Sequence, residues 1–132
     1  MRKFDLEDRL IDFAVLILDL SESLPAKHGS THLAKQLVRS GTAPALQYGE
    51  AQSAESRKDF IHKTKIALKE LRETLICLKI LERKSYLKSG DALSKALKEN
   101  NELISIFVTS ISTATKNLKS EEANPQPPDI QH

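Results

Sequence analysis

The feature that most constrains the fold is the spacing of apolar residues in the last third of the chain. Between Leu93 and Leu118, seven apolar residues and one asparagine recur at alternating intervals of four and three residues. They are Leu93, Leu97, Asn100, Ile104, Phe107, Ile111, Ala114 and Leu118. Because an α-helix turns once every ~3.6 residues, this spacing places all of them on one side of a long helix. Such a side is typical of a helix that packs in a bundle.

Three earlier segments repeat this spacing and predict three further helices. The expected helices cover about residues 5–23, 31–55, 56–86 and 91–118. Ser56 and Asp91 each stand at the start of a segment, where a side-chain oxygen can accept a hydrogen bond from a free backbone amide. Pro25 follows the first segment and favours its end there.

No segment shows the alternation of a half-buried β-strand, so the fold class is predicted to be all-α. Short connections between long amphipathic helices favour an antiparallel up-down-up-down four-helix bundle over residues 1–118. The chain of 132 residues is the size of one domain. Residues 119–132 are polar and proline-rich, and we expect a disordered tail there.

Two interruptions of the apolar pattern fall inside predicted helices. Pro44 lacks the amide hydrogen that would bond to the Ser40 carbonyl, so the second helix should kink there. Small residues such as Gly41 surround it and indicate a packing notch, with an anion pocket built on Ser40, Thr42 and Arg39 as the alternative. Asn100 interrupts the fourth helix, where a buried amide is expected to fix the register of packing rather than bind a ligand.

No residue set is typical of catalysis, and we predict that the protein is not an enzyme and holds no cofactor or metal. His28 and His32 are the only histidines at helical metal-ligand spacing, without a third ligand nearby. The chain has no Glu-x-x-His motif and no glycine-rich phosphate loop. Cys77 is the single cysteine, so it cannot form an internal disulfide, and we interpret it as a packing residue.

The N-terminal sequence does not resemble a signal peptide, because acidic residues occupy the place of its apolar core. The apolar run from Phe13 to Leu18 is much shorter than the ~20 residues that span a bilayer. We therefore expect a soluble, unprocessed, cytoplasmic protein without a membrane partner.

Charge is distributed unevenly along the chain. The net charge is +2, but residues 57–98 carry 12 basic and 5 acidic side chains, a net of +7, whereas residues 1–26 carry a net of −3. Such a segment permits a surface that binds phosphates, and the alternative is a solvated helix face with many ion pairs. The hypothesised nucleic-acid contacts are Arg57, Lys58, Lys65, Lys69 and Arg72. No aromatic residues alternate with them, so binding would be directed at the backbone of RNA or DNA.

Apolar residues outside the bundle-facing positions indicate contact between subunits. The expected interface residues are Ile11, Val15 and Leu18 in the first helix and Ile66, Ile76 and Ile80 in the third. Large aliphatic side chains are costly to leave in water, so we predict a homo-oligomer. The alternative is that these faces bind a different protein, and that the chain is a structural interaction module with no nucleic-acid role.

The middle of the chain resembles a known bacterial family. The matching stretches are Arg39-Ser-Gly-Thr42, Pro44-Ala-Leu46, Tyr48-Gly-Glu-Ala-Gln52, Ala54-Glu-Ser-Arg-Lys-Asp-Phe-Ile-His62 and Leu68-Lys-Glu-Leu-Arg-Glu-Thr74. They are similar to the four-helix-bundle proteins encoded in intervening sequences of large-subunit rRNA genes, over about residues 4–118. Ala43 and Gln47 depart from a Ser-Pro-Ala-Leu-Asn-Tyr pattern that is usual there, which would alter any hydrogen bond between those two side chains.

This resemblance implies a small cytoplasmic bacterial protein of unknown function that assembles into a symmetric ring, typically a pentamer. It implies no enzymatic activity. A related branch contains accessory proteins of diversity-generating retroelements, which bind nucleic acid and partner a reverse transcriptase. The resemblance therefore favours RNA or DNA as a partner, with a reverse transcriptase or another protein as a further one.

Overall fold

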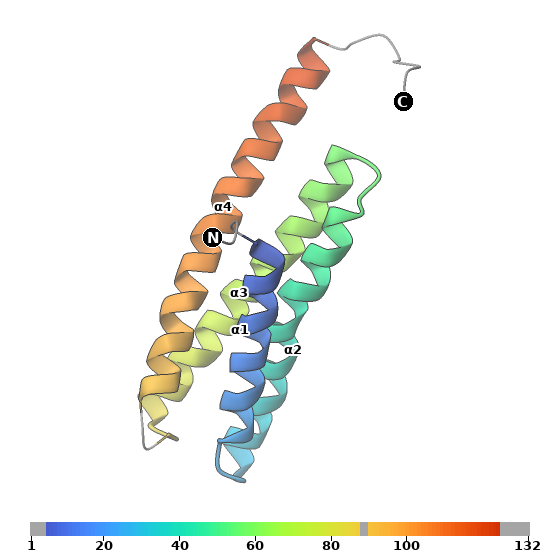
Figure 1. Ribbon diagram of the computed structural model, residues 1–132. Coiled ribbons are helices and arrows are strands. Elements are labelled where there is room, and N and C mark those ends of the chain that lie inside the picture. The colour runs from blue at the N-terminus through green and yellow to red at the C-terminus, as the bar shows by residue number, and fades with distance from the viewer. Residues whose placement is uncertain (1–4, 88–89, 125–132) are drawn as a thin grey trace.

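The protein is built from four α-helices, and the parts of the chain that the structure describes, residues 5–87 and 90–124, contain no β-strand. In this computed structural model α1 spans Leu6–Glu22, α2 His28–Gln52, α3 Arg57–Lys84 and α4 Asp91–Ala123 (Figure 1). The predicted all-α class is confirmed, and each predicted helix is present within a few residues of its expected limits.

Each helix packs against two others. α1 contacts α2 and α4, and α3 also contacts α2 and α4, whereas α1 and α3 lie diagonally and do not contact each other. In Figure 1 the α1–α2 connection lies at the lower end and the α2–α3 connection at the upper end. α1 is the shortest of the four helices, and α4 extends well beyond it at the upper end.

One of the two predicted capping residues is confirmed, and the other is wrong. Ser56 Oγ accepts a hydrogen bond from the Asp59 amide at 3.0 Å, as predicted for the start of α3. Asp91 was expected to cap α4, but it is the first residue of the helix, and Gly90, which has no side chain, occupies the cap position. α3 ends at Ser85, whose φ of 58° lies in the left-handed region that terminates helices.

α4 is longer than predicted. Residues 119–123 were assigned to the tail, but they form the last turn of this helix, which ends at Ala123. The prediction of disorder for the rest of the tail concerns residues 125–132, which lie outside the described residues. The helical boundary of the domain is therefore at residue 123 rather than 118.

The core is formed mainly by bundle-facing residues that the spacing identified, together with Leu103, which the spacing did not include. Its largest fully buried side chains are aromatic and aliphatic, with two rings at the centre. They are Phe13, Phe107, Leu10, Ile17, Leu20, Leu37, Leu71, Leu78, Leu81 and Leu103. Tyr48 packs edge-on against Phe107, with ring centroids 5.9 Å apart. Cys77 also belongs to this core, which confirms its role as a packing residue.

The predicted packing notch in α2 is present at Gly41. A Cβ atom at this position would lie 2.5 Å from Cγ2 of Ile17, a fully buried side chain of α1. Glycine therefore permits α1 and α2 to approach closely at this level. Gly49, eight residues or about two turns further along the same helix, has no such neighbour within 4 Å.

Asn100 is completely buried between α4 and α3. With its amide nitrogen directed at the Leu71 carbonyl oxygen, the two atoms are 3.0 Å apart, and its side-chain oxygen lies 3.3 Å from the Leu75 amide nitrogen. The side chain thus hydrogen-bonds to the backbone of a single turn of α3, between Leu71 and Leu75. This geometry is what a residue that fixes the register of α4 on α3 requires.

Candidate nucleic-acid interface

Four of the five predicted contact residues share the outward face of α3. Lys58, Lys65, Lys69 and Arg72 are exposed, and at 100° per residue they fall within an arc of roughly 60°. α3 buries its opposite side, which carries Ala67, Leu71 and Leu78, in the core. We call these four residues the basic stripe.

Arg57, the fifth predicted contact residue, does not belong to the basic stripe. It lies roughly 60° to 120° around the helix from the other four and faces α4. Its Nε and Nη2 atoms are 2.8 Å and 2.7 Å from Oε1 of Glu121. This ion pair could not be predicted from the sequence, because the two residues are far apart in the chain and Glu121 lies in the segment that we assign to the tail.

The sides of α3 differ from its outward face because their charges are paired. Toward α2, Arg39 bonds to Glu70 at 2.9 Å and also to Glu73. Lys63 donates to Glu50 Oε1 at 2.8 Å, and this hydrogen bond raises the pKa of Lys63. The hypothesis of a solvated face with ion pairs therefore applies to these sides of the helix.

Within the described part of the chain, no residue of the basic stripe forms an ion pair. Lys58 and Arg72 are 14 positions apart, which corresponds to about 21 Å along the helix axis. Four cations that form no ion pair within the described residues produce a positive potential over this length that attracts a polyanion, although Glu73, four residues after Lys69, weakens it there.

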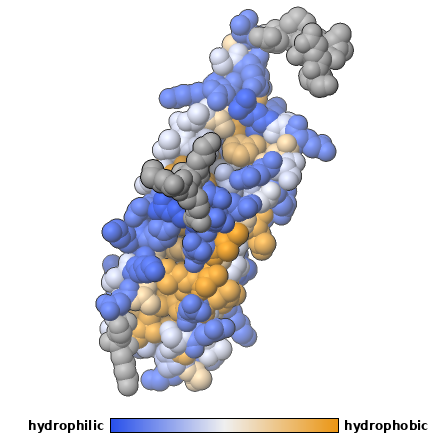
Figure 2. Space-filling model, in the orientation of Figure 1, coloured by the Kyte–Doolittle hydropathy of each residue, from blue (hydrophilic) through white to orange (hydrophobic). Residues whose placement is uncertain are grey.

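The predicted subunit-interface residues are exposed with one exception. Ile76 of α3 and Val15 of α1 expose 55% and 51% of their surface, and Ile11, Leu18 and Ile80 are also exposed. Figure 2 shows hydrophobic atoms gathered on the face that α1 presents to the viewer. Ile66 is instead half-buried, because it lies on the side of α3 that carries Glu70 and Glu73 and faces α2.

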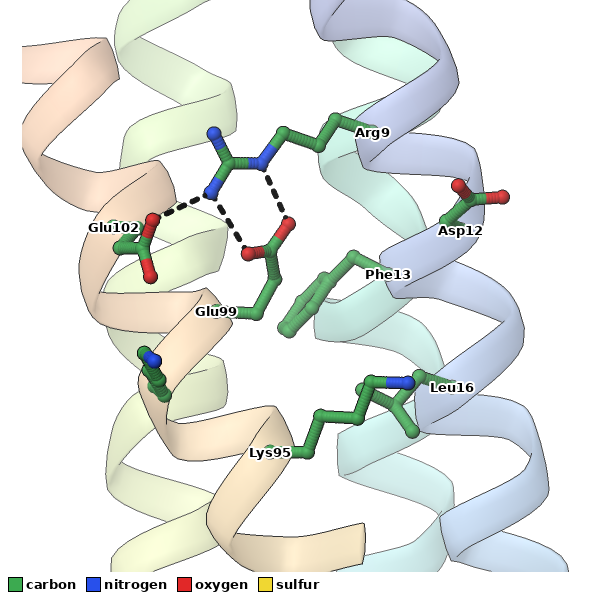
Figure 3. A pocket seen from close by; sticks show the side chains of 8 residues that line it. Arg9, Asp12, Phe13, Leu16, Lys95, Glu99 and Glu102 are labelled. Atoms are coloured by element: carbon green, nitrogen blue, oxygen red, sulfur yellow. Dashed lines mark hydrogen bonds and ion pairs between the residues drawn. The ribbon is translucent and has the colours of Figure 1, made fainter.

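A groove of about 390 Å³ separates α1 from α4. Phe13 and Leu16 form its apolar part, while Arg9 crosses it to α4 (Figure 3). Arg9 donates to both oxygens of Glu99 at 2.8 Å and to Glu102 at 2.9 Å. The bonds to Glu99 raise the pKa of Arg9, so its guanidinium group stays charged. The groove was not predicted, because no local sequence signal links α1 to residues some 90 positions away.

The alternative anion pocket in α2 has no support in the structure. Arg39 is bound by two glutamates, and the Thr42 hydroxyl donates to the Val38 carbonyl at 2.7 Å. Close to them, Gln47 has a buried Oε1 atom without a hydrogen-bond partner. The sequence comparison had pointed to altered hydrogen bonding at this position. In residues 5–87 and 90–124 no three potential metal ligands come together, His28 and His32 included.

Cys77 should react slowly with thiol reagents in the folded protein. Its side chain is buried, and burial raises the pKa of the thiol above its ordinary value, so little thiolate forms at neutral pH. We expect labelling by a chromogenic disulfide reagent at pH 7.5 to be at least about a hundredfold slower than after denaturation. Labelling at equal rates in both states would contradict the burial of this residue.

None of the helices in the described ranges is long and apolar enough to cross a lipid bilayer.

The comparisons with known proteins identify the family. Residues 2–109 match the model of the 23S rRNA-intervening sequence protein family, and because this match covers most of the chain, the protein belongs to that family. A solved structure from Bacteroides thetaiotaomicron VPI-5482, described as a protein with unknown function from the S23 ribosomal protein family, is similar in sequence and fold. It shares 33% identity with a TM-score of 0.75, over 81% of this chain and 98% of that one. No curated protein matches the chain.

Proposed function

We propose that this protein is a non-enzymatic, cytoplasmic accessory protein that binds RNA or DNA through the basic stripe of α3. We further propose that it is an antiparallel up-down-up-down bundle that assembles into a homo-oligomeric ring, for which its family resemblance favours five subunits. The observation that carries the nucleic-acid proposal is the set of four unpaired cations on one face of one helix.

The arrangement of the basic stripe favours backbone contacts over base recognition. Lysine and arginine side chains on one straight helix can each reach a phosphate, whereas base-specific binding needs side chains inside a groove or stacked against bases. Phe60, the only Phe, Tyr or Trp between Lys58 and Arg72, falls on the opposite side of the helical wheel from the four residues. Binding should therefore depend steeply on salt and weakly on sequence.

Ring assembly would strengthen such binding. Four contacts in one protomer give weak affinity at physiological salt, but several stripes on one particle act together on the same polyanion. A family named after intervening sequences of 23S rRNA is consistent with an RNA partner.

The exposed aliphatic side chains support a second candidate function, a structural module that binds another protein, such as a reverse transcriptase. The observation that favours this function is the exposure of Ile11, Val15 and Ile76 to solvent. In that case removal of the basic stripe would leave function intact.

The nucleic-acid proposal is tested with Lys65→Gln combined with Lys69→Gln. We expect this variant to bind a fluorescent single-stranded RNA of about 20 nucleotides about thirtyfold more weakly at low salt, because two contacts of roughly 1 kcal/mol each are lost. The slope of log affinity against log salt concentration should become shallower by about 1.4. Fluorescence anisotropy across a salt series measures both quantities.

A matched control removes the same charge elsewhere. Lys35 of α2 and Lys116 of α4 are exposed and lie outside the basic stripe. Lys35→Gln with Lys116→Gln should therefore retain most of the affinity. Equal losses in the two double variants would show that only net charge matters, and no binding by the native chain at low salt would refute the proposal.

A further inference from the structure

Two outward faces of the bundle carry exposed aliphatic side chains surrounded by charges of opposite sign. The first, which we call the acidic face, is on α1 and consists of Glu7, Ile11, Val15, Leu18, Asp19 and Glu22. The second, the isoleucine face, is near the end of α3 and consists of Ile76, Lys79, Ile80 and Arg83. The aliphatic part of the acidic face, Ile11 to Leu18, covers about 10 Å of helix, and so does the whole isoleucine face, Ile76 to Arg83.

The charged side chains that make up the two faces are opposite in sign, while next to the isoleucine face Glu73 is paired with Arg39 and Glu82 is exposed. Residues 5–22 contain six acidic residues and one basic residue, Arg9, which is held by Glu99 and Glu102 of α4. The isoleucine face contains no acidic residue. Neither Lys79 nor Arg83 forms an ion pair within the described part of the chain.

We propose that the acidic face of one copy of this chain docks on the isoleucine face of another copy. This inference rests on the proposed homo-oligomer and specifies how its subunits meet. Contact would remove Val15 and Ile76 from water, and it would place Asp19 and Glu22 near Lys79 and Arg83. Two acidic faces, or two isoleucine faces, would repel each other in a symmetric dimer.

The positions of the faces determine the kind of assembly. α1 and α3 occupy diagonal corners of the bundle and do not contact each other, so the two faces point away from one another (Figure 1). A pair of copies therefore leaves one face of each kind unused. Such head-to-tail contacts form a ring when the rotation from copy to copy closes, and an open filament when it does not.

The same arrangement leaves Lys58 and Lys65 free. They lie 11 or more positions before Ile76, at least about 16 Å along α3. Arg72 and Lys69, the other two residues of the basic stripe, lie only four and seven positions before Ile76, so the subunit contact would border the stripe at Arg72 and leave its Lys58 end open in every subunit.

The test is the particle mass of the full chain, measured by light scattering during size-exclusion chromatography. Val15→Asp and Ile76→Asp should each convert an oligomer of more than two copies into a monomer of 14.8 kDa. Both side chains are already half-exposed in the protomer, so the substitutions should leave its helical circular dichroism unchanged. Leu46→Asp and Val108→Asp replace exposed aliphatic residues outside both faces and should leave the oligomer intact.

A charge exchange makes the test specific for these two faces. Asp19→Lys with Glu22→Lys should dissociate the particle, as should Lys79→Glu with Arg83→Glu, because each creates faces of like charge. Combining all four substitutions in one chain should restore the oligomer. Restoration would be the result that supports direct contact between the faces.

The possible failures are distinguishable. A native chain that is monomeric would refute the proposed oligomer together with this inference. A native oligomer that survives Val15→Asp and Ile76→Asp would overturn this inference alone. Neither result affects the comparison of Lys65→Gln and Lys69→Gln with its control, which tests nucleic-acid binding independently.

Discussion

Gly41→Ala and Gly49→Ala, the same change in the same helix, are expected to alter stability in opposite directions. At Gly41 the new methyl group would lie 2.5 Å from Cγ2 and 2.9 Å from Cγ1 of Ile17. Ile17 is branched and fully buried, so it cannot rotate away without moving its helix. We expect the free energy of unfolding to fall by about 2 kcal/mol, after the gain in helix propensity is included.

Gly49→Ala is the matched control for this prediction. No atom lies within 4 Å of the position a Cβ would take, and the backbone there is helical. The substitution should raise the free energy of unfolding by about 0.5 to 1 kcal/mol, because alanine has the higher helix propensity. Urea denaturation at one fixed protein concentration measures both changes.

The clash itself can be tested by removing its partner. Ile17→Ala alone should cost at least about 2 kcal/mol, but the double variant with Gly41→Ala should cost less than the sum of the two single changes. If Gly41→Ala stabilised the protein as much as Gly49→Ala, the close approach of α1 and α2 would be wrong.

Asn100→Asp should be among the most destabilising isosteric substitutions in this chain. The side chain is fully buried, and its amide nitrogen faces the Leu71 carbonyl oxygen at 3.0 Å. A carboxylate there would lose this donor and place a negative charge beside a carbonyl oxygen in the core. We expect a loss of roughly 3 kcal/mol or more at pH 7.

The loss should depend on pH in a defined direction. Burial would raise the pKa of the introduced carboxyl group in the folded protein above its unfolded value of about 3.9. The unfolded state then releases its proton first, so the destabilisation grows by about 1.4 kcal/mol per pH unit above pH 4, up to the folded pKa. Thermal or urea unfolding at pH 4 and pH 8 measures this difference.

Asn101→Asp provides the control for charge and pH. Asn101 is the exposed neighbour of Asn100, so its substitution should change stability by no more than about 0.5 kcal/mol. Subtracting its effect at each pH removes contributions from the rest of the protein. Equal effects at positions 100 and 101 would contradict the buried hydrogen bond between α4 and α3.

Much of the fold was predictable from the sequence because its core depends on helical periodicity. Many of the residues that recur every three or four positions, such as Leu10, Leu78 and Phe107, are buried, although every second member of the series in α4 is only half-buried. Helix limits were less predictable. Lys119-Ser-Glu-Glu-Ala123 contains good helix formers and no proline before Pro125, so α4 continues through it instead of ending at Leu118.

The candidate site was predictable only where it lies on one helix. The helical wheel of α3 already groups Lys58, Lys65, Lys69 and Arg72 on one face. Whether a basic residue is paired depends on distant partners, and for Arg57 that partner is Glu121 on α4. Periodicity within a helix carries no information about such contacts, so the sequence could not remove Arg57 from the set.

Lysine footprinting of the full chain, with and without a single-stranded RNA of about 20 nucleotides, tests most directly whether the outward face of α3 is the functional surface. Acetylation of exposed lysines is measured by mass spectrometry at low salt. Our account predicts that RNA slows acetylation of Lys58, Lys65 and Lys69 several-fold and leaves Lys35 and Lys116 unchanged. Equal protection at all five, or protection of Lys35 and Lys116 alone, would contradict it.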